Sequence, residues 1–580
     1  MAEVIIMPKL GFNMDSGQLV TWHKKVGDAV KKGEPLFDIN TDKTTMPVEA
    51  TQDGVLLKVM LAEGESADVF TPIAVVGAAG ENPDAALAAH GGAAPAAAKP
   101  SAPAAKAEPT AKSAPAASAK TGNYDHEITV IGGGPGGYVA AIKAAREGKK
   151  VCLIEEKHLG GVCLNEGCIP TKTLLKTANL LSEIRHAGEF AIEGIQADKL
   201  SVNMARLQER RKKVIATLVG GVKGLVRGNK ITLIEATARF VDAHTVEAGG
   251  KRITSEHFII ATGSDVFMPP FIALEGKNNI LTSREALTLD KVPASVAIIG
   301  GGVIGVEFAS LLGKLGAKVT VLELLENLMP MVDPEVSALA KKRLEKDGIV
   351  FRMQAKVTRV KDNTVHYELA GREETVKADA VLMAVGRVPR TEGLGAAEIG
   401  IEFDRRAVKT DAHLRTNIPN IYCIGDVNGK VMLAHVASHE GMLAVENILG
   451  HDKEMNYNHV PSCIYLDPEI ACIGLTEAQA KETGRQLKIG RFKMVGNGKS
   501  LVEGETDGLV KVILDGELGE ILGLHMYGKH ATDMISELSV ALTLEATADE
   551  IIDSIHPHPT VSEAIPEAFM AAYGKAIHSL

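Results

Sequence analysis

The stretch His126–Gly137 reads HEITVIGGGPGG, a run of strand-forming residues that leads into a glycine-rich turn of the pattern G-x-G-x-x-G. A second copy, SVAIIGGGVIG, occupies Ser295–Gly305. In each copy a later apolar run ends in an acid, Glu155 or Glu323, which follows the first glycine by 23 residues (132 to 155, and 300 to 323). One glycine motif alone is weak evidence. Two copies, each with strand, helix and acid in place, predict two Rossmann-like dinucleotide-binding domains in an α/β protein.

The residues of each copy indicate its chemistry. Glycines let the backbone approach a pyrophosphate, which rests on the positive N-terminal end of the following helix, and the acid accepts hydrogen bonds from an adenosine ribose. The cofactor-binding candidates are the motif glycines and acids, namely Gly132, Gly134, Gly137 and Glu155 in the first copy and Gly300, Gly302, Gly305 and Glu323 in the second. No arginine stands near Glu323, so a 2′-phosphate would be repelled and the second site is expected to bind NAD rather than NADP.

Two cysteines, Cys163 and Cys168, lie in the stretch CLNEGCIPTK, about 30 residues after the first glycine motif. A thiol pair beside a bound dinucleotide indicates electron transfer between a disulfide and a cofactor. Lys172 lies four residues beyond Cys168, on the same face of the expected helix, where a cation stabilises a thiolate. The remaining cysteines stand in apolar surroundings and are expected to be buried small hydrophobes: Cys152, Cys423, Cys463 and Cys472. Their spacings do not indicate zinc.

Near the C-terminus, the segment 556–563 reads HPHPTVSE. A histidine between prolines is held rigidly, and Glu563 is close enough in sequence to orient an imidazole and stabilise its protonated form. The two histidines, His556 and His558, could instead bind a metal, but no third ligand is evident, so no metal site is predicted.

These motifs resemble the FAD-dependent pyridine nucleotide-disulfide oxidoreductases, especially the dihydrolipoamide dehydrogenases, from about residue 124 to residue 580. The resemblance implies that Cys163 exchanges with a substrate thiol and that Cys168 contacts the flavin. It also implies that Lys172 pairs with Glu307. The sequence departs from the family at Glu166, where an apolar residue is common. A carboxylate between the cysteines would raise their pKa values and lower the electron affinity of the pair, unless it points to solvent.

The same resemblance assigns the first glycine motif to FAD. The segment ATGS at 261–264 looks like the family's strand leaving the FAD domain, and IYCIGD at 421–426 matches its second flavin motif, in which Asp426 would bind the ribityl chain. The segment LAH at 433–435 would approach the flavin ring. The further cofactor-binding residues implied are Thr262, Gly263, Gly386, Asp426 and Ala434.

The resemblance also implies a reaction. His558 would be the base and Glu563 its partner, serving the disulfide of the other subunit, so that a homodimer is required. The expected activity is flavin-dependent oxidation of dihydrolipoamide with reduction of NAD+, as the E3 component of a 2-oxo acid dehydrogenase complex that also contains an acyltransferase. The alternative is another NAD-linked disulfide reductase. Mercuric reductase usually adds a cysteine pair near the C-terminus, which is absent here, and glutathione reductase would use NADP.

A small β-rich domain is expected before residue 81. Short apolar runs alternate with turn signals, and Asp42-Lys43 would occupy the tip of a hairpin. Most turn lysines are simply solvated, but the surrounding residues 2–78 resemble a lipoyl domain, in which Lys43 would carry lipoate in amide linkage. A biotinyl domain has Met on both sides of its lysine, and this sequence does not. The alternative reading is a docking or carrier module for the complex, with Lys43 not turning over.

The expected domains are the lipoyl domain (1–80), an Ala/Pro-rich flexible linker (81–122), the first part of the FAD domain (123–270), the NAD domain (271–390), the second part of the FAD domain (391–457) and an α+β dimerisation domain (458–580). The linker is too poor in apolar residues to fold. A net charge of −10 argues against nucleic acid as a partner. No apolar run is long enough to span a bilayer, and no leader is recognisable, so the cytoplasm is the expected location.

Overall fold

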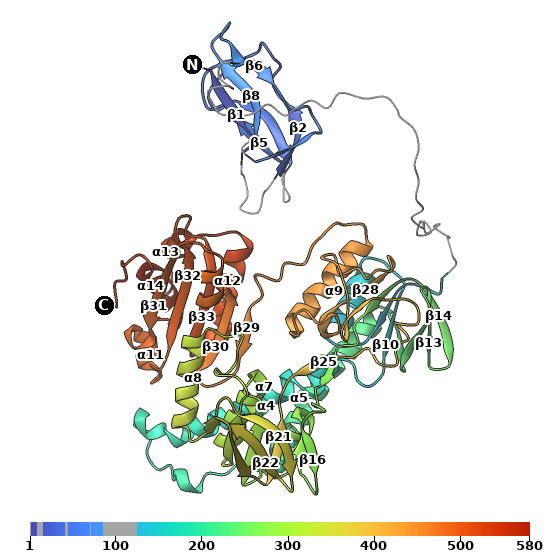
Figure 1. The fold of residues 1–580 in the computed structure, drawn as a ribbon, viewed down its shortest axis with the longest axis vertical. Helices are drawn as coiled ribbons and strands as arrows, with labels where there is room; N and C mark the ends of the chain where they lie inside the picture. The colour runs from blue at the N-terminus through green and yellow to red at the C-terminus, as the bar shows by residue number, and fades with distance from the viewer. Residues whose placement is uncertain are drawn as a thin grey trace. The chain divides into compact units, whose positions relative to one another are not determined.

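The computed structural model describes residues 2–8, 16–40, 45–69, 71–84, 87 and 124–579. The chain divides into two compact units, Met1–Ser118 and Ala119–Leu580, and each is described by itself (Figure 1). Among the described residues, no helix is both long and apolar enough to cross a membrane.

The N-terminal unit contains two four-stranded antiparallel sheets, ordered β1-β8-β6-β3 and β5-β4-β2-β7. Its strands are β1 (Glu3–Ile6), β2 (Ser16–Trp22), β3 (Ala29–Val30), β4 (Pro35–Asn40), β5 (Thr45–Glu49), β6 (Gly54–Val59), β7 (Ser66–Asp68) and β8 (Pro72–Gly77). The expected all-β domain is confirmed. β4 and β5 form a hairpin in which Asn40 pairs with Thr45. Lys43, predicted at its tip, lies outside the described residues.

The small unit has its own apolar core. Side chains of its strands fill the core, among them Leu19, Leu36, Ile39, Leu56 and Ile73, all fully buried. Trp22, the only tryptophan of the chain, packs its ring on Phe37 at 4.8 Å between centroids and donates from Nε1 to the Leu61 carbonyl at 3.1 Å. Because this core is complete within the small unit, we expect the unit to fold on its own.

The first glycine motif belongs to a seven-stranded sheet with parallel strands at its centre. Its strands are β9 (His126–Ile131), β10 (Val151–Glu155), β11 (Thr232–Glu235), β12 (Ala238–Asp242), β13 (Thr245–Ala248), β14 (Lys251–Ile260) and the distant β28 (Ile421–Cys423), which pairs with β14. β28 therefore returns the chain to the first sheet after the second nucleotide segment. Two short pairs lie outside this sheet. β15 (Ser264–Val266) pairs with β25 (Arg387–Pro389) where the chain enters and leaves the second nucleotide segment, and β26 (Phe403–Asp404) pairs with β27 (Ala407–Val408) in a local hairpin.

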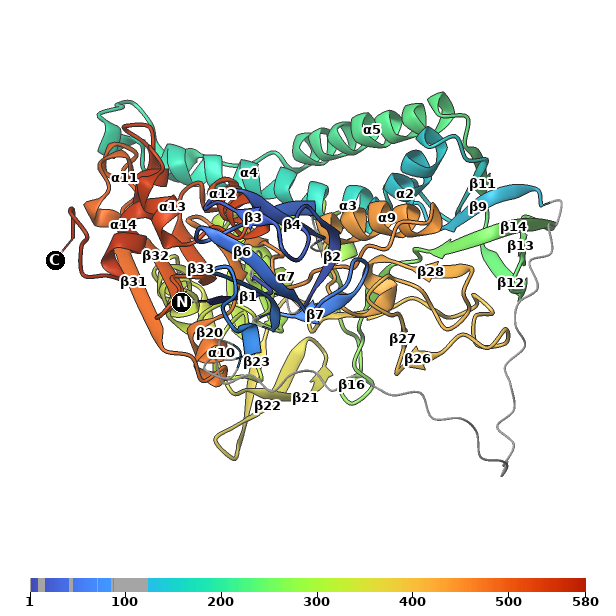
Figure 2. The ribbon, with the colours of Figure 1, turned by 90° about the horizontal axis from the view of Figure 1, so that it is seen from above.

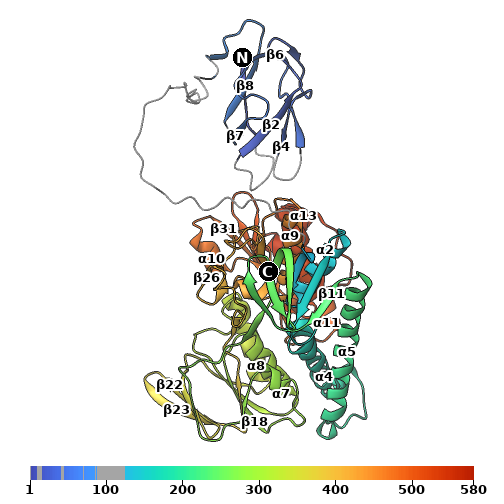
Figure 3. The ribbon, with the colours of Figure 1, turned by 90° about the vertical axis from the view of Figure 1, so that its right-hand side faces the viewer.

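Helices cover this sheet and lead from it to the second nucleotide segment. They are α2 (Pro135–Arg146), α3 (Gly161–Asn165), α4 (Cys168–Arg185), α5 (Met204–Gly228) and α9 (Ala434–Ile448). α2 and α9 pack so closely that a Cβ on Gly441 would lie 2.6 Å from the Gly136 carbonyl oxygen. α4 and α5 lie side by side along one edge of the large unit (Figure 2 and Figure 3).

The second glycine motif lies in a five-stranded parallel sheet, β17-β24-β18-β19-β20. The elements of this segment are β17 (Ile280–Leu281), β18 (Ser295–Ile299), β19 (Lys318–Leu322), β20 (Val350–Arg352), β24 (Ala380–Met383), α6 (Ser283–Ala286), α7 (Val303–Lys314) and α8 (Pro334–Lys346). A smaller sheet joins β16 (Ala273–Glu275), β21 (Lys356–Lys361), β22 (Thr364–Leu369) and β23 (Arg372–Lys377). Both predicted Rossmann-like domains are therefore confirmed.

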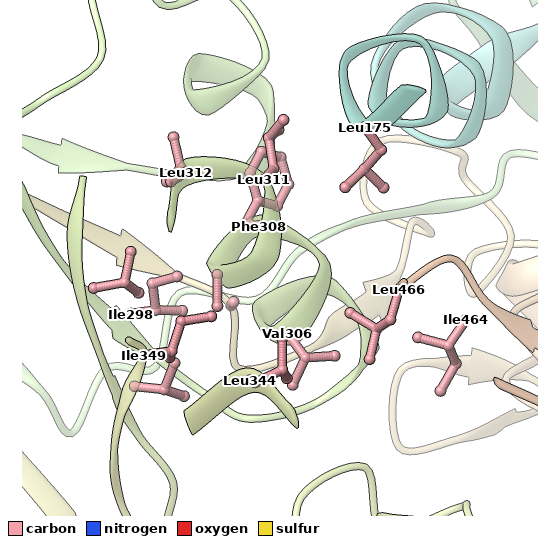
Figure 4. Packing of buried hydrophobic residues seen from close by; sticks show 14 of the residues in the cluster. Leu175, Ile298, Val306, Phe308, Leu311, Leu312, Leu344, Ile349, Ile464 and Leu466 are labelled. Carbon is pink, nitrogen blue, oxygen red and sulfur yellow. The ribbon is translucent and has the colours of Figure 1, made fainter. Parts of the chain in front are cut away.

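The C-terminal segment is an antiparallel sheet covered by helices, as expected. Its elements are β29 (Ser462–Ile464), β30 (Glu469–Gly474), β31 (Leu487–Lys493), β32 (Leu509–Asp515), β33 (Ile521–Gly528), α10 (Glu477–Glu482), α11 (Gly498–Val502), α12 (Ala531–Thr543), α13 (Ala548–Asp553) and α14 (Ala564–Ala571). Figure 4 shows how one apolar core joins this segment to the rest: Ile464 and Leu466 pack near α7 residues such as Val306, with Leu175 of α4 close by. α7, which belongs to the second nucleotide segment, thus packs near both α4 and the start of the C-terminal segment.

Candidate active site

The two glycine turns have nearly the same geometry. Gly132 and Gly300 have φ of 108° and 109°, in the left-handed region that favours glycine. A Cβ on Gly137 would lie 1.8 Å from the Gly132 carbonyl oxygen, and in the second copy a Cβ on Gly305 would lie 1.9 Å from the Gly300 carbonyl oxygen. Only glycine therefore allows each helix to approach its strand so closely.

The acids that follow the glycine turns also occupy matching positions. Glu155 accepts hydrogen bonds from the Gly133 amide at 2.6 Å and from the Lys157 amide at 2.7 Å. Glu323 accepts from the Gly301 amide at 2.5 Å and from the Leu325 amide at 2.8 Å. Each carboxylate thus lies against its own glycine turn, where a ribose would be placed.

Both glycine turns and both cysteines line one cavity of about 750 Å³. Its wall includes Gly132, Gly134, Cys163, Cys168, Lys172, Thr262, Gly263, Gly302, Glu307, Asp426 and Ala434. A Cβ added to Gly302 would have no heavy atom within 4 Å, and a Cβ added to Gly134 would have its nearest heavy atom at 3.9 Å. A bound ligand therefore has room at both helix N-termini. The cavity volume is within the usual range for cofactor pockets. These residues fit dinucleotide cofactors.

The two thiols interact with each other. Cys163 lies in the short helix α3 and Cys168 begins α4, which brings the side chains within hydrogen-bonding reach. A hydrogen bond from the Cys163 thiol lowers the pKa of Cys168 to about 7, and Lys172 adds to this effect against the opposing effect of burial. The same hydrogen bond and burial raise the pKa of Cys163. The pair therefore favours a thiolate at Cys168, the cysteine that shares α4 with Lys172.

Lys172 contacts Glu307, as the resemblance implied. Its Nζ lies 2.9 Å from Oε1 and 2.8 Å from Oε2 of Glu307, a residue of α7 whose side chain is only 4% exposed. Oε1 of Glu307 also accepts from the Tyr465 amide at 3.0 Å, and the Lys172 ammonium lies 4.6 Å from the Tyr465 ring centroid. The lysine is thus held against the thiols by a buried carboxylate from the second nucleotide segment.

The second flavin motif is held by buried polar groups that the sequence did not reveal. Glu440 of α9 is fully buried and accepts from the Gly425 amide at 2.5 Å and from the Tyr457 hydroxyl at 2.5 Å. Burial raises the pKa of Glu440. Asp426 accepts from the Ser264 hydroxyl, which in turn accepts from Arg387 Nε at 2.8 Å. These contacts orient the turn that carries Asp426 toward the cavity.

The other cofactor-binding candidates lie near these groups. Thr262 donates to the Arg390 carbonyl at 2.6 Å, and the residue after it, Gly263, has φ of 73°. Gly386, at φ 124°, precedes β25 but is not among the cavity-lining residues. Ala434 begins α9 at the cavity wall.

Glu166 neither points freely to solvent nor stays unpaired between the thiols. Its carboxylate lies 2.5 Å from Nε of Arg284, a residue of α6 that sequence reasoning did not single out. Cys463 also differs from expectation: it is half-buried and lines the cavity, because β29 ends at the cavity wall, whereas Cys152, Cys423 and Cys472 are buried as expected.

The C-terminal histidines form two separate ion pairs. His558 Nδ1 lies 2.9 Å from Glu563, and the His558 side chain is 77% exposed. His556 Nε2 instead lies 2.9 Å from Glu537, and that histidine is nearly buried. His558 is not among the residues that line the thiol cavity of its own chain. In the described part of the chain, no group of three metal-ligating side chains is present.

Comparison with known proteins agrees with this geometry. Residues 126–441 match the pyridine nucleotide-disulphide oxidoreductases, residues 460–569 match the dimerisation domain of those enzymes, and residues 3–76 match the biotin-requiring enzyme (biotin/lipoyl) family. A dihydrolipoyl dehydrogenase of Bacillus subtilis (strain 168) is 41% identical over 78% of this chain and 100% of its own length. The mitochondrial dihydrolipoyl dehydrogenase of Pisum sativum is 37% identical over 79% of this chain and 93% of its own.

Among solved structures, the HOCl-induced flavoprotein disulfide reductase RclA from Escherichia coli is similar, with a TM-score of 0.68 and 27% identity. It covers 76% of this chain and 99% of its own length. Three matched families in the expected order, together with relatives of about 40% identity over almost their whole length, leave one conclusion. The chain belongs to the pyridine nucleotide-disulphide oxidoreductase family.

Proposed function

We propose that the chain is a dihydrolipoyl dehydrogenase that oxidises dihydrolipoamide to lipoamide and reduces NAD+ to NADH. The observation that supports this most directly is the shared cavity: two dinucleotide-binding turns, a thiol pair and the Lys172–Glu307 ion pair all face it. FAD, when bound, would accept two electrons from the thiol pair and deliver them to NAD+ as hydride.

The residues of the chain act on the substrate thiols. His558 removes a proton from one thiol of dihydrolipoamide, and Glu563 stabilises the imidazolium that results. The substrate thiolate then attacks Cys163 of the Cys163–Cys168 disulfide. A bond forms between the substrate sulfur and Cys163 while Cys168 leaves as a thiolate, which Lys172 stabilises. The second substrate thiolate then attacks the substrate sulfur that is bonded to Cys163. The bond between that sulfur and Cys163 breaks, lipoamide closes its ring, and Cys163 leaves as a thiolate, so that both cysteines are reduced.

The position of His558 fits a homodimer. Its ring is exposed and lies apart from the thiol cavity of its own chain, on the segment that matches the dimerisation domain. We infer that His558 serves the thiol pair of the partner subunit. A variant that cannot dimerise should therefore lose turnover while it keeps FAD.

The N-terminal unit matches the biotin/lipoyl family and supplies a covalent lipoyl group at Lys43 in this proposal. Serving as the E3 component of a 2-oxo acid dehydrogenase complex, the enzyme would meet an acyltransferase that carries further lipoyl groups. If the N-terminal unit is only a docking module, mass spectrometry of the purified protein will find Lys43 without lipoate. A cytoplasmic location stays a prediction.

The decisive experiment is an NAD+-dependent assay with dihydrolipoamide, run beside glutathione and other disulfide-forming thiols. Of the thiols tested, we expect only dihydrolipoamide to be oxidised. A higher kcat/KM with another thiol would instead favour a different NAD-linked disulfide reductase. The similarity to the flavoprotein disulfide reductase RclA is the reason to include other thiols in the test.

A further inference from the structure

Glu166 occupies the redox turn, the segment Cys163–Cys168 that carries both thiols. A free carboxylate in this turn would oppose thiolate formation. Its Oε2 instead lies 2.5 Å from Nε of Arg284, which comes from α6 of the second nucleotide segment. We infer that Arg284 is a positioning residue for the redox turn: it holds the Glu166 carboxylate in a neutral ion pair at the cavity wall, so that the carboxylate does not act on the thiols. This inference rests on the proposed thiol chemistry.

Arg284 is itself anchored by a second acid. Its Nη2 lies 2.6 Å from Oδ1 of Asp265 in β15, the strand that leaves the first nucleotide sheet. Asp265 lies 3.7 Å from Arg390, which also pairs with Glu156 just after β10. Opposite charges thus alternate along this wall. Because Asp265 holds the guanidinium independently, Arg284 should stay in place when Glu166 is replaced.

The charges that act most strongly on the thiols come from residues outside the redox turn. Lys172 favours the thiolate form of both cysteines, Asp426 opposes it at Cys163, and Glu307 opposes it at Cys168. The other titratable groups that interact with the thiols are Tyr138 of α2 and Tyr465 after β29, and Cys463 lines the same cavity wall. Those facing Glu166 are Arg284 and Arg387.

Although Glu166 lies between the cysteines in the sequence, the guanidinium of Arg284 neutralises its charge. The side chains of Glu166 and Arg284 are 31% and 30% exposed, so the pair is only partly screened by water. Replacing one partner therefore changes the net charge beside the thiols by one unit, and the sign depends on which partner is replaced.

The test uses this difference in sign. Arg284→Gln removes one positive charge and leaves the Glu166 carboxylate without its cation. The pH at which thiol alkylation reaches half its maximal rate should therefore rise by about one unit, the size expected for one charge at roughly 10 Å in a protein environment. Glu166→Gln removes the carboxylate and leaves Arg284 on Asp265, so this midpoint should not rise. The double variant Glu166→Gln/Arg284→Gln removes one charge of each sign, and Asp265 keeps Arg390 at 3.7 Å, so it should return close to the native midpoint.

The measurement follows iodoacetamide alkylation of Cys163 and Cys168 against pH in the reduced full-length holoenzyme, read by peptide mass spectrometry. Arg252→Gln is the matched control, because it breaks an exposed ion pair with Glu247 at 3.2 Å and should change nothing. Arg284→Lys keeps a cation near Glu166 and should stay close to the native midpoint. If Arg284→Gln fails to fold, folding of the double variant with a native midpoint still supports the inference, and failure of both overturns it.

A midpoint that rises equally in Arg284→Gln and Glu166→Gln would show a purely structural bridge and would overturn the inference, as would an unchanged midpoint in Arg284→Gln. Failure of the proposed function gives a different result, namely native protein whose Cys163 and Cys168 form no disulfide on oxidation. The two failures are therefore distinguishable.

Discussion

Replacing Lys172 with Met is the sharpest test of how the site is built. The change removes the ammonium that lies 2.9 and 2.8 Å from the two oxygens of Glu307 and leaves that carboxylate, 4% exposed, without its cation. Removing one partner of a buried ion pair typically costs 3–5 kcal/mol. Lys172 is itself 30% exposed and the Tyr465 amide still donates to Glu307, so we expect a cost near the lower end, about 3 kcal/mol.

The double variant Lys172→Met/Glu307→Gln leaves no buried charge and should recover most of this loss. The unfolding assay has an internal control in the chain. Trp22 is the only tryptophan and lies in the N-terminal unit, so its fluorescence reports that unit, whereas fluorescence of released flavin reports the large unit. In urea, Lys172→Met should move only the flavin transition. Because the chain has several domains, each transition is fitted separately.

The same variant should change thiol chemistry. In the native protein, thiolate at Cys168 is present above pH about 7 and is lost as the pH falls through this value. Without Lys172 the pKa of Cys168 should rise toward the ordinary value of 9.0, and the thiolate absorbance at neutral pH should fall. A flavin transition and a thiolate profile both identical to native would refute the proposed role of the ion pair.

Further predictions follow from other parts of the chain. Cys163→Ser should keep FAD and the fold but abolish lipoamide turnover in the NAD+ assay; near-normal turnover would contradict the thiol assignment. Because no lysine or arginine occurs between Glu323 and Lys341 in the sequence, steady-state kinetics should give a much higher kcat/KM for NAD+ than for NADP+, and comparable values would disprove this. Gly137→Ala should lose bound FAD, since its Cβ would lie 1.8 Å from a carbonyl oxygen; a normal flavin spectrum would count against the turn geometry. Deleting residues 1–120 should spare activity with free dihydrolipoamide and remove any lipoyl mass at Lys43, whereas loss of FAD would show that the small unit is structural.

The sequence predicted those features whose signal is local. Each glycine motif with its strand, helix and acid lies within about 30 residues, and the two Rossmann-like domains predicted from these motifs are confirmed. β10 ends at Glu155 as expected, and β19 ends one residue before Glu323. The small β-domain was likewise predictable from its own pattern, whereas the C-terminal domain was expected only from the family resemblance.

Contacts between distant segments were not predictable from spacing. Arg284 and Glu166 come from different domains, and neither residue type has a local pattern that points to the other. Lys172 and Glu307 are 135 residues apart, and only a family resemblance connected them in advance. The sequence did not single out the fully buried Glu440, because only the folded chain brings its partners Gly425 and Tyr457 within hydrogen-bonding distance.

The two acids Glu155 and Glu323 have a consequence for the thermodynamics of binding. Each already accepts hydrogen bonds from the backbone of its own glycine turn and from an amide two residues beyond the acid. The turn is therefore ordered before any nucleotide arrives, and little conformational entropy remains to be lost on binding. Shortening either side chain to Asp should thus weaken affinity mainly through a less favourable binding entropy, a signature that calorimetry separates from the loss of a single ribose contact.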